Sequence, residues 1–234
     1  MGISVCIASG KDGVGKSVVA ANLAIVLSSL GVETLIVDGD IEGASVGLIL
    51  GVDPGGLTIH DCLSGKADPK KAVIEASGTK AVIGAIGIEQ LVGASLENFP
   101  SILEDFTGAF DIVLVDSQGG LGDNTVTVIG SCQALLLVLT PDIGSVTNGL
   151  KILAVAKKLG TTVLGALINR SGSPYDIPAD KIADLMRLDV IGELPEDETV
   201  KRALFEGVPV SVGYPDSPFS KEIRSVADKL IGRT

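Results

Sequence analysis

The sequence predicts an α/β protein with a single doubly wound, mostly parallel sheet. Three features support this prediction: short apolar runs alternate with helical patterns, the apolar residues are mainly aliphatic, and polar residues follow directly after several apolar runs. Hydrophobic residues make up 46% of the chain but aromatic residues only 3%, and aliphatic side chains usually fill parallel sheets covered by helices on both faces. No linker, repeat or low-complexity stretch divides the 234 residues, so we expect one domain over 1–234.

Short apolar runs that end at polar or glycine residues predict the buried strands. The first run stops at Ser9-Gly10, and later runs stop directly before Asp38 and Asp116. On this pattern we predict strands at residues 3–8, 34–37, 81–86, 112–115, 134–139, 162–168 and 190–194.

Apolar residues at helical spacing predict the helices between these strands. Gly31 and Gly160 are C-terminal stop signals, and Pro100 suits the first turn of a helix. In a doubly wound sheet, ligands bind at the carboxyl ends of the strands, where the polar candidates of this sequence cluster. The predicted helices cover residues 17–30, 98–106, 145–159, 179–187, 198–206 and 219–231.

A phosphate-binding loop connects the first predicted strand to the first predicted helix. Residues 10–17 read Gly-Lys-Asp-Gly-Val-Gly-Lys-Ser and satisfy G-x-x-x-x-G-K-[ST] in full. The glycines let several backbone N–H groups point at one phosphate, and the helix N-terminus adds partial positive charge. We expect Lys16 to reach the β- and γ-phosphates and the Ser17 hydroxyl to bind Mg²⁺. The predicted nucleotide-binding residues of the loop are Gly10, Lys11, Asp12, Gly13, Val14, Gly15, Lys16 and Ser17.

Aspartates follow two other predicted strands. Asp38 and Asp40 stand two residues apart just past a strand, where one can hold a water ligand of the metal and the other can orient the attacking water. Residues 111–116 show four apolar residues followed by an aspartate, a pattern typical of the second phosphate-site motif. Asp116 is therefore expected to hold Mg²⁺ directly or through water.

Lys11, a second lysine directly after the first loop glycine, is not required by the general phosphate-loop pattern. This lysine resembles the extra lysine of the deviant phosphate loop, K-G-G-x-G-K-[ST], of the MinD/ParA family. Asp38-x-Asp40 resembles the D-x-D pattern of the same family. The resemblance extends over nearly the whole chain and is closest to archaeal MinD-like proteins in 192–203 and 207–210. It implies a P-loop NTPase fold of the deviant Walker A class. It also implies an ATP-dependent homodimer in which Lys11 touches phosphates bound by the other subunit.

The resemblance implies individual roles as well. Asp40 corresponds to the hydrolysis residue, and Asp38 lies in the shell around the metal. Asn169 reads the edge of adenine and Pro195 lies on the other side of the base. The chemistry of these residues does not by itself separate ATP from GTP. The resemblance thus gives ATP and Mg²⁺ as cofactors, Lys11, Lys16 and Asp40 as catalytic residues, and Ser17, Asp38 and Asp116 as the metal site.

The sequence departs from the family pattern at two positions. Asp12 stands where the family has glycine, and an acidic side chain beside phosphates is electrostatically unfavourable. Gln118 stands where the family has proline, which predicts a less rigid loop after Asp116. Both departures concern affinity and rate rather than nucleotide binding itself.

The net charge and the spacing of the cysteines limit the partners and the compartment that we expect for this protein. The formal net charge is −11 and no long Lys/Arg run is present, so we expect no non-specific binding to nucleic acid. The last apolar helix face, in 219–231, is expected to pack on the core, and the three residues after it are too few for a stable membrane anchor. Cys6, Cys62 and Cys132 are widely spaced, which predicts reduced thiols in a cytoplasmic protein.

The sequence therefore favours an ATP-gated dimerisation switch that hydrolyses ATP slowly and is recognised by a partner protein, in spatial regulation of the cell-division type. Two alternatives share this phosphate loop. A metal-cluster scaffold or metallochaperone generally needs paired cysteines at a dimer interface, for which Cys132 is the candidate. A small-molecule ligase of the dethiobiotin-synthetase type needs a substrate pocket. The sequence does not name the partner, the cargo or the turnover rate.

Overall fold

Eight strands form one sheet in the computed structural model, which describes residues 2–53, 55–87 and 94–233. The strand order is β3-β4-β2-β5-β1-β6-β7-β8, and the strand pairs are parallel except for β3 with β4. The predicted α/β class with a mostly parallel sheet is confirmed. The strands are β1 (Ile3–Ala8), β2 (Thr34–Gly39), β3 (Ile74–Ala76), β4 (Thr79–Val82), β5 (Ile112–Ser117), β6 (Ala134–Leu139), β7 (Thr162–Ser171) and β8 (Val190–Pro195).

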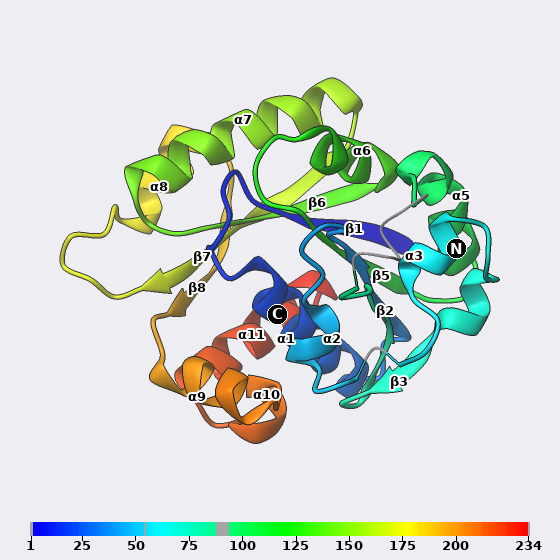
Figure 1. Cartoon of the computed structure of the whole chain (residues 1–234). Helices are drawn as coiled ribbons and strands as arrows, with labels where there is room; N and C mark the ends of the chain where they lie inside the picture. Colours follow the sequence, from blue (N-terminus) through cyan, green and yellow to red (C-terminus); the bar gives the residue numbers. More distant parts are fainter. Residues whose placement is uncertain (1, 54, 88–93, 234) are drawn as a thin grey trace.

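Helices cover both faces of this sheet (Figure 1). One layer contains α1 and α11, and the opposite layer contains α5, α6, α7 and α8. None of the described helices is both long and apolar enough to cross a bilayer. The helices are α1 (Lys16–Ser29), α2 (Val46–Ile49), α3 (Ile59–Leu63), α5 (Phe99–Thr107), α6 (Asp123–Ser131), α7 (Ile143–Leu159), α8 (Ala179–Met186), α9 (Glu198–Glu206), α10 (Val210–Gly213) and α11 (Pro218–Leu230).

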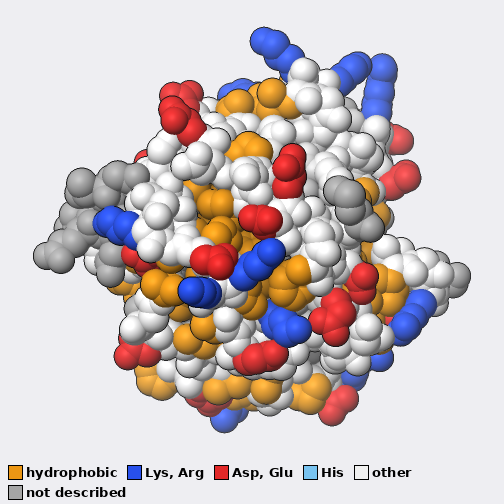
Figure 2. All heavy atoms as spheres, turned by 90° about the vertical axis from the view of Figure 1, so that its right-hand side faces the viewer, with side chains coloured by type: hydrophobic (Ala, Val, Ile, Leu, Met, Phe, Trp, Pro, Cys, Tyr) orange, Lys and Arg blue, Asp and Glu red, His pale blue; other side chains and the backbone are white. Residues whose placement is uncertain are grey.

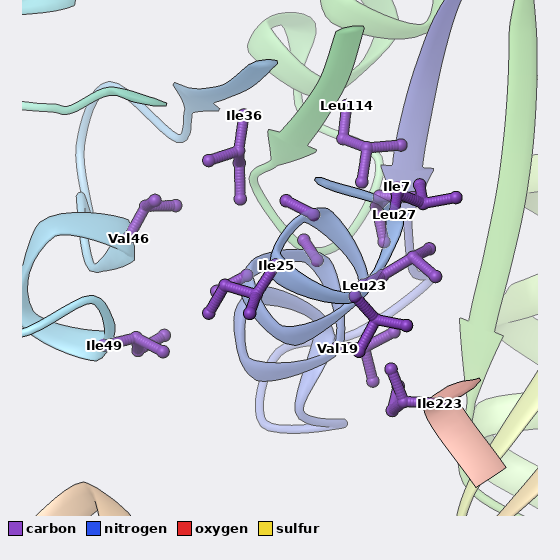
Figure 3. Packing of buried hydrophobic residues seen from close by; sticks show 14 of the residues in the cluster. Ile7, Val19, Leu23, Ile25, Leu27, Ile36, Val46, Ile49, Leu114 and Ile223 are labelled. Carbon is purple, nitrogen blue, oxygen red and sulfur yellow. The ribbon is translucent and has the colours of Figure 1, made fainter. Parts of the chain in front are cut away.

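Helix α1 is buried on nearly all sides, which fixes the position of the phosphate loop that precedes it. Its residues from Val19 to Leu27 are all buried, as expected for a helix that is apolar around its whole circumference. In Figure 3, Ile25 lies on the side of α2, and Val19 lies towards Ile223 of α11. The sheet, α2 and α11 thus hold α1 from different directions, and the start of the helix is rigidly placed.

Truncating the centre of α1 is expected to destabilise the protein strongly. Leu23 is fully buried, so Leu23→Ala removes apolar contacts and leaves a cavity, with an expected loss of about 3 kcal/mol in the free energy of unfolding. Leu185→Ala on α8 is the matched control: its side chain is 58% exposed, and the expected change is below about 1 kcal/mol. Urea denaturation measures both, and equal losses would contradict the central placement of α1.

The structure differs from the predicted elements around β4. The predicted strand 81–86 ends at Val82, because the backbone of Ile83 turns away and its carbonyl accepts a hydrogen bond from the Ile59 N–H. Strand β3 pairs antiparallel with β4 through Ser77 and Gly78, whose φ angles of 49° and 83° give a tight hairpin turn. Helix α6 was not predicted, because several of its residues are β-branched and mask the helical pattern.

On the face that carries α3 and α5, charged side chains of both signs are interspersed with hydrophobic ones (Figure 2). The basic side chains of this face lie among acidic ones rather than in one patch.

Candidate functional site

The phosphate loop lies between the carboxyl end of β1 and the amino end of α1. Gly13 and Gly15 have φ angles of 77° and 87°, in the region that favours glycine. A Cβ atom on Gly15 would collide with the amide nitrogen of Asn169, and one on Gly10 would collide with the backbone of Asn148. The glycines of the motif are therefore required both by the curl of the loop and by its close neighbours.

A buried charge cluster lies beneath the loop. Lys16 Nζ is 3.3 Å from Asp116 Oδ1, and both side chains are almost completely buried. Asp38 lies opposite Asp116 in the register of β2 with β5, so a second carboxyl group adjoins this ion pair. Burial, and then the charge of Asp116, raises the pKa of Asp38 to about 8. Burial also raises the pKa of Asp116, against the opposing effects of Lys16 and the Ser17 hydroxyl.

This cluster fits a divalent cation. Among the described residues, Asp116 Oδ2 is buried and has no hydrogen-bond partner. An unpaired, buried carboxyl oxygen beside a second carboxyl group suits a hard, oxygen-preferring cation such as Mg²⁺. Ser17 and Asp116 would hold the ion, with Asp38 beside them, and a bound Mg²⁺ would neutralise charge on the β- and γ-phosphates.

Asp38 also organises the loop that follows β2. Its Oδ2 atom accepts hydrogen bonds from the N–H groups of Ser45 and Val46, both at 3.1 Å, and its Oδ1 accepts one from Asp40 N–H at 3.3 Å. These bonds reach both oxygens and hold the Asp38 carboxyl group in place beside Asp116.

The phosphate loop opens into a cavity of about 430 Å³. Asp40 lines this cavity, is half-buried, and accepts a 2.8 Å hydrogen bond from the Gly43 N–H. Residues from Lys11 to Ser17 line the cavity, and Asp40, directly after β2, lines it as well. The structure thus brings Lys16, Ser17 and Asp40 together, as the sequence predicts.

A second, smaller cavity of about 80 Å³ adjoins the first. Asn169 and Pro195, the two residues expected to contact the base, both line it. Asn169 is buried, and its amide nitrogen donates a 2.7 Å hydrogen bond to the Val14 carbonyl. This bond links β7 to the phosphate loop and orients the Asn169 amide, a contact that the sequence did not predict.

Lys11 lies at the rim of the phosphate cavity in an ion pair within its own chain. Its Nζ is 2.9 Å from Asp142 Oδ2 and 3.1 Å from Asp142 Oδ1. Asp142 is the N-cap of α7, where its carboxylate also accepts hydrogen bonds from Thr140 and from the Ser145 N–H. The lysine side chain is therefore held at the mouth of the cavity and not inside it.

The ion pair between Lys11 and Asp142 is expected to affect the pKa of the Asp142 carboxyl group. Partial burial acts to raise the pKa of this carboxyl, but the hydrogen bonds from Thr140, Lys11 and Ser145 outweigh it and lower the pKa to about 2 from an ordinary 3.8. A lowered pKa means that the contribution to stability is complete above the ordinary value and is lost as the pH falls towards 2. Carboxyl ¹³C NMR measures this pKa, and Lys11→Ala should move it towards 3.8. An unchanged value in Lys11→Ala would contradict the pairing.

The two departures from the family pattern contact the loop that follows β5. Asp12 packs against Gly119, where a Cβ atom would collide with the Asp12 carboxylate. Gln118 Nε2 donates a 3.0 Å hydrogen bond to Glu42 Oε2, and Asn124 Nδ2 donates one of 3.0 Å to Glu42 Oε1. Gln118 thus ties its loop to the loop after β2. Glu42 was missed because no local pattern marks its partners.

The three cysteines are all buried free thiols. Cys132, the candidate for a cysteine shared between two subunits, is only 5% exposed. Within residues 2–53, 55–87 and 94–233, no group of three or more His, Cys, Asp or Glu side chains is arranged to hold a metal ion. All three cysteines belong to the hydrophobic core on the side of the sheet that carries α5 to α8.

Comparisons with known proteins agree with this site. The family model described as ParA, NUBPL iron-transfer P-loop NTPase, matches residues 2–231. An ATP-binding protein of Methanocaldococcus jannaschii is 36% identical over 99% of this chain and 89% of its own length. An iron-sulfur cluster carrier protein of Saccharolobus solfataricus is 30% identical, covering 96% of this chain and 81% of the carrier.

A solved structure is also very similar. The septum site-determining protein MinD of Pyrococcus horikoshii, determined as a complex with Mg-ADP, superposes with a TM-score of 0.94 at 32% identity. The match covers 98% of this chain and 96% of that one. A relative of this fold thus carries a magnesium nucleotide, which is the ligand class that the phosphate loop and the buried carboxylates fit.

Proposed function

Because this chain belongs to the ParA family of P-loop NTPases, we propose that it binds and hydrolyses Mg-ATP and uses it to switch between monomer and homodimer. The observation that carries the proposal is the position of Lys11 at the open rim of a complete phosphate loop. At this position the ammonium group can leave Asp142 and reach across to phosphates held by a second copy. ATP and Mg²⁺ are the cofactors of the proposed activity.

The rim of the phosphate cavity supports coverage by a second copy. Leu48 and Leu204 line the cavity and are 57% and 44% exposed, so apolar surface lies beside the phosphate loop. A second copy that covers the cavity would remove these side chains from water and strengthen the electrostatic interactions inside. Association would thus follow from nucleotide binding at the same face.

The proposed chemistry assigns a distinct task to each polar group. Lys16 and the loop N–H groups stabilise the negative charge of the β- and γ-phosphates. Asp40 orients the attacking water, because its carboxylate lines the cavity and is held by the Gly43 N–H. Hydrolysis removes the γ-phosphate, and with it the contact that Lys11 makes across the dimer. We expect this turnover to be slow until a partner protein binds.

Sedimentation velocity with and without a slowly hydrolysed ATP analogue tests the switch. The unchanged protein is expected to be a monomer without nucleotide and a dimer with the analogue and Mg²⁺. Lys11→Ala is expected to stay monomeric under both conditions while still binding the nucleotide. Lys158→Ala, an exposed lysine in the last turn of α7, is the matched control and should dimerise normally. A dimer equally strong without nucleotide would contradict the proposal.

We further propose that an unidentified partner protein recognises the dimer and that the switch serves spatial regulation, in the cytoplasm. The MinD structure of Pyrococcus horikoshii is named for septum-site determination, which supports a positioning role of this kind. Affinity purification with the Asp40→Ala protein and ATP, compared with ADP, tests this. Partners retained only with ATP would support it, and identical partners with both nucleotides would contradict it.

A second candidate function is the carriage of an iron-sulfur cluster. It is favoured by the description of the matching family as iron-transfer NTPases and by the carrier protein of Saccharolobus solfataricus. Burial of Cys6, Cys62 and Cys132 weighs against it, since a cluster shared between subunits requires thiolates at the surface. Iron and sulfide content after anaerobic purification distinguishes the two functions, because only a carrier would retain stoichiometric amounts of both.

A further inference from the structure

Arg170 lies at the junction of the base cavity and the phosphate cavity. Four described residues line both cavities: Gly15, Val18, Arg170 and Leu204. Arg170 is the charged residue among them. A ligand that fills both cavities must therefore pass this side chain.

The backbone at Arg170 is unusual for an arginine. Its φ angle is +60°, in the left-handed region that residues with a Cβ atom rarely adopt. The register of β7 with β8 shifts between Asn169 and Ser171, so Arg170 forms a bulge in the strand. Bulges of this kind redirect a side chain, and unfavourable backbone conformations cluster at ligand-binding sites. Without the bulge, Arg170 would follow the regular alternation of β7.

The guanidinium group of Arg170 is also available for a ligand. Its nearest ionic neighbour is Glu196, with 3.8 Å between Nε and Oε2, which is too long for a hydrogen bond. Within the described part of the chain, the guanidinium donates no hydrogen bond, and the side chain is 53% exposed. Glu196 holds the group near the junction without using its donors.

We propose that Arg170 binds the nucleotide between base and β-phosphate by donating hydrogen bonds to oxygens of the α-phosphate. This inference rests on the proposed function, which places the β- and γ-phosphates at Lys16 and the base beside Asn169 and Pro195. The part of the nucleotide between the base and the β-phosphate consists of the ribose and the α-phosphate. The α-phosphate is the negatively charged group of that part. A planar guanidinium matches phosphate oxygens with parallel donors, and Arg170 is the one charged residue among those described that lines both cavities.

Calorimetric titration with Mg-ADP at two salt concentrations tests the proposal on the unchanged protein, Arg170→Asn and Arg187→Asn. Asparagine tolerates the left-handed backbone, so Arg170→Asn should keep the melting temperature of the unchanged protein. Arg187 is the matched control: it is an exposed arginine at the end of α8 with a φ angle of 50°, and it lines neither cavity.

Arg170→Asn is expected to weaken Mg-ADP binding by about tenfold or more and to reduce its salt dependence, while Arg187→Asn stays within about twofold. Equal affinities of Arg170→Asn and the unchanged protein would overturn this inference alone, as would equal losses in Arg170→Asn and Arg187→Asn. Absence of binding by the unchanged protein would overturn the proposed function together with this inference.

Discussion

Lys16→Ala is expected to reduce ATP hydrolysis by about 100-fold or more and to remove measurable Mg-ADP binding. Lys16 is buried under the phosphate loop and is the cation that faces Asp116 and the expected position of the β- and γ-phosphates. Its removal takes away this positive charge and leaves Asp116 without its ion-pair partner. Neither water nor a surface lysine can replace a buried ammonium group at this position.

Calorimetry with Mg-ADP and a phosphate-release assay measure these effects, and circular dichroism verifies that the variant is folded. Lys11→Ala is the matched control, because its lysine belongs to the same loop but lies at the rim. We expect Lys11→Ala to retain nucleotide binding as a monomer, so the two lysines should separate binding from dimerisation. Binding of Mg-ADP by Lys16→Ala within about threefold of the unchanged protein would contradict the assigned role.

Asp40→Ala is expected to lower the rate of ATP hydrolysis by about 100-fold or more while leaving nucleotide binding intact. Asp40 contacts the Gly43 N–H and lines the phosphate cavity, but it is not part of the buried Lys16–Asp116 cluster. The variant should therefore keep the cradle for the phosphates and lose the base that orients water. Ordinary ATP should then hold it as a persistent dimer.

The measurement is sedimentation velocity at intervals after addition of Mg-ATP, in parallel with phosphate release. The unchanged protein should return to monomer as ATP is consumed, whereas Asp40→Ala should remain dimeric. Asp40→Asn tests whether charge or shape matters, and Asp105→Ala on α5 controls for loss of an exposed carboxylate elsewhere. Phosphate release by Asp40→Ala at the unchanged rate would move the hydrolytic role to another residue.

Some of the site could be predicted because its signals are local. Residues 10–17 contain the whole phosphate-loop pattern in consecutive positions, and the flanking strand and helix are apparent from the apolar spacing on either side. The placement of Asp40 at the phosphate cavity follows from a strand end and the rule that carboxyl ends of parallel strands share one edge. Helix α6 and strand β3 were missed because their residues have weak or conflicting local preferences.

Other parts of the site depend on contacts between distant segments. Lys11 meets Asp142 across 131 positions, and Asn169 meets Val14 across 155. The tie between Gln118 and Glu42 joins two loops that are 76 positions apart. No periodicity or turn pattern specifies such pairs, because each partner alone is an ordinary polar residue at the end of an element.

The sequence by itself therefore determined the alternation of strands and helices, the phosphate loop and the chemical class of its ligand, because these depend on neighbouring residues. Tertiary structure alone decided that β5 lies between β1 and β2, which places Asp116 opposite Asp38 and against Lys16. It also decided that a bulge directs Arg170 to the junction of two cavities. The physical reason is that strand order and side-chain pairing arise from packing of the whole chain, whereas local sequence encodes only the elements that are packed.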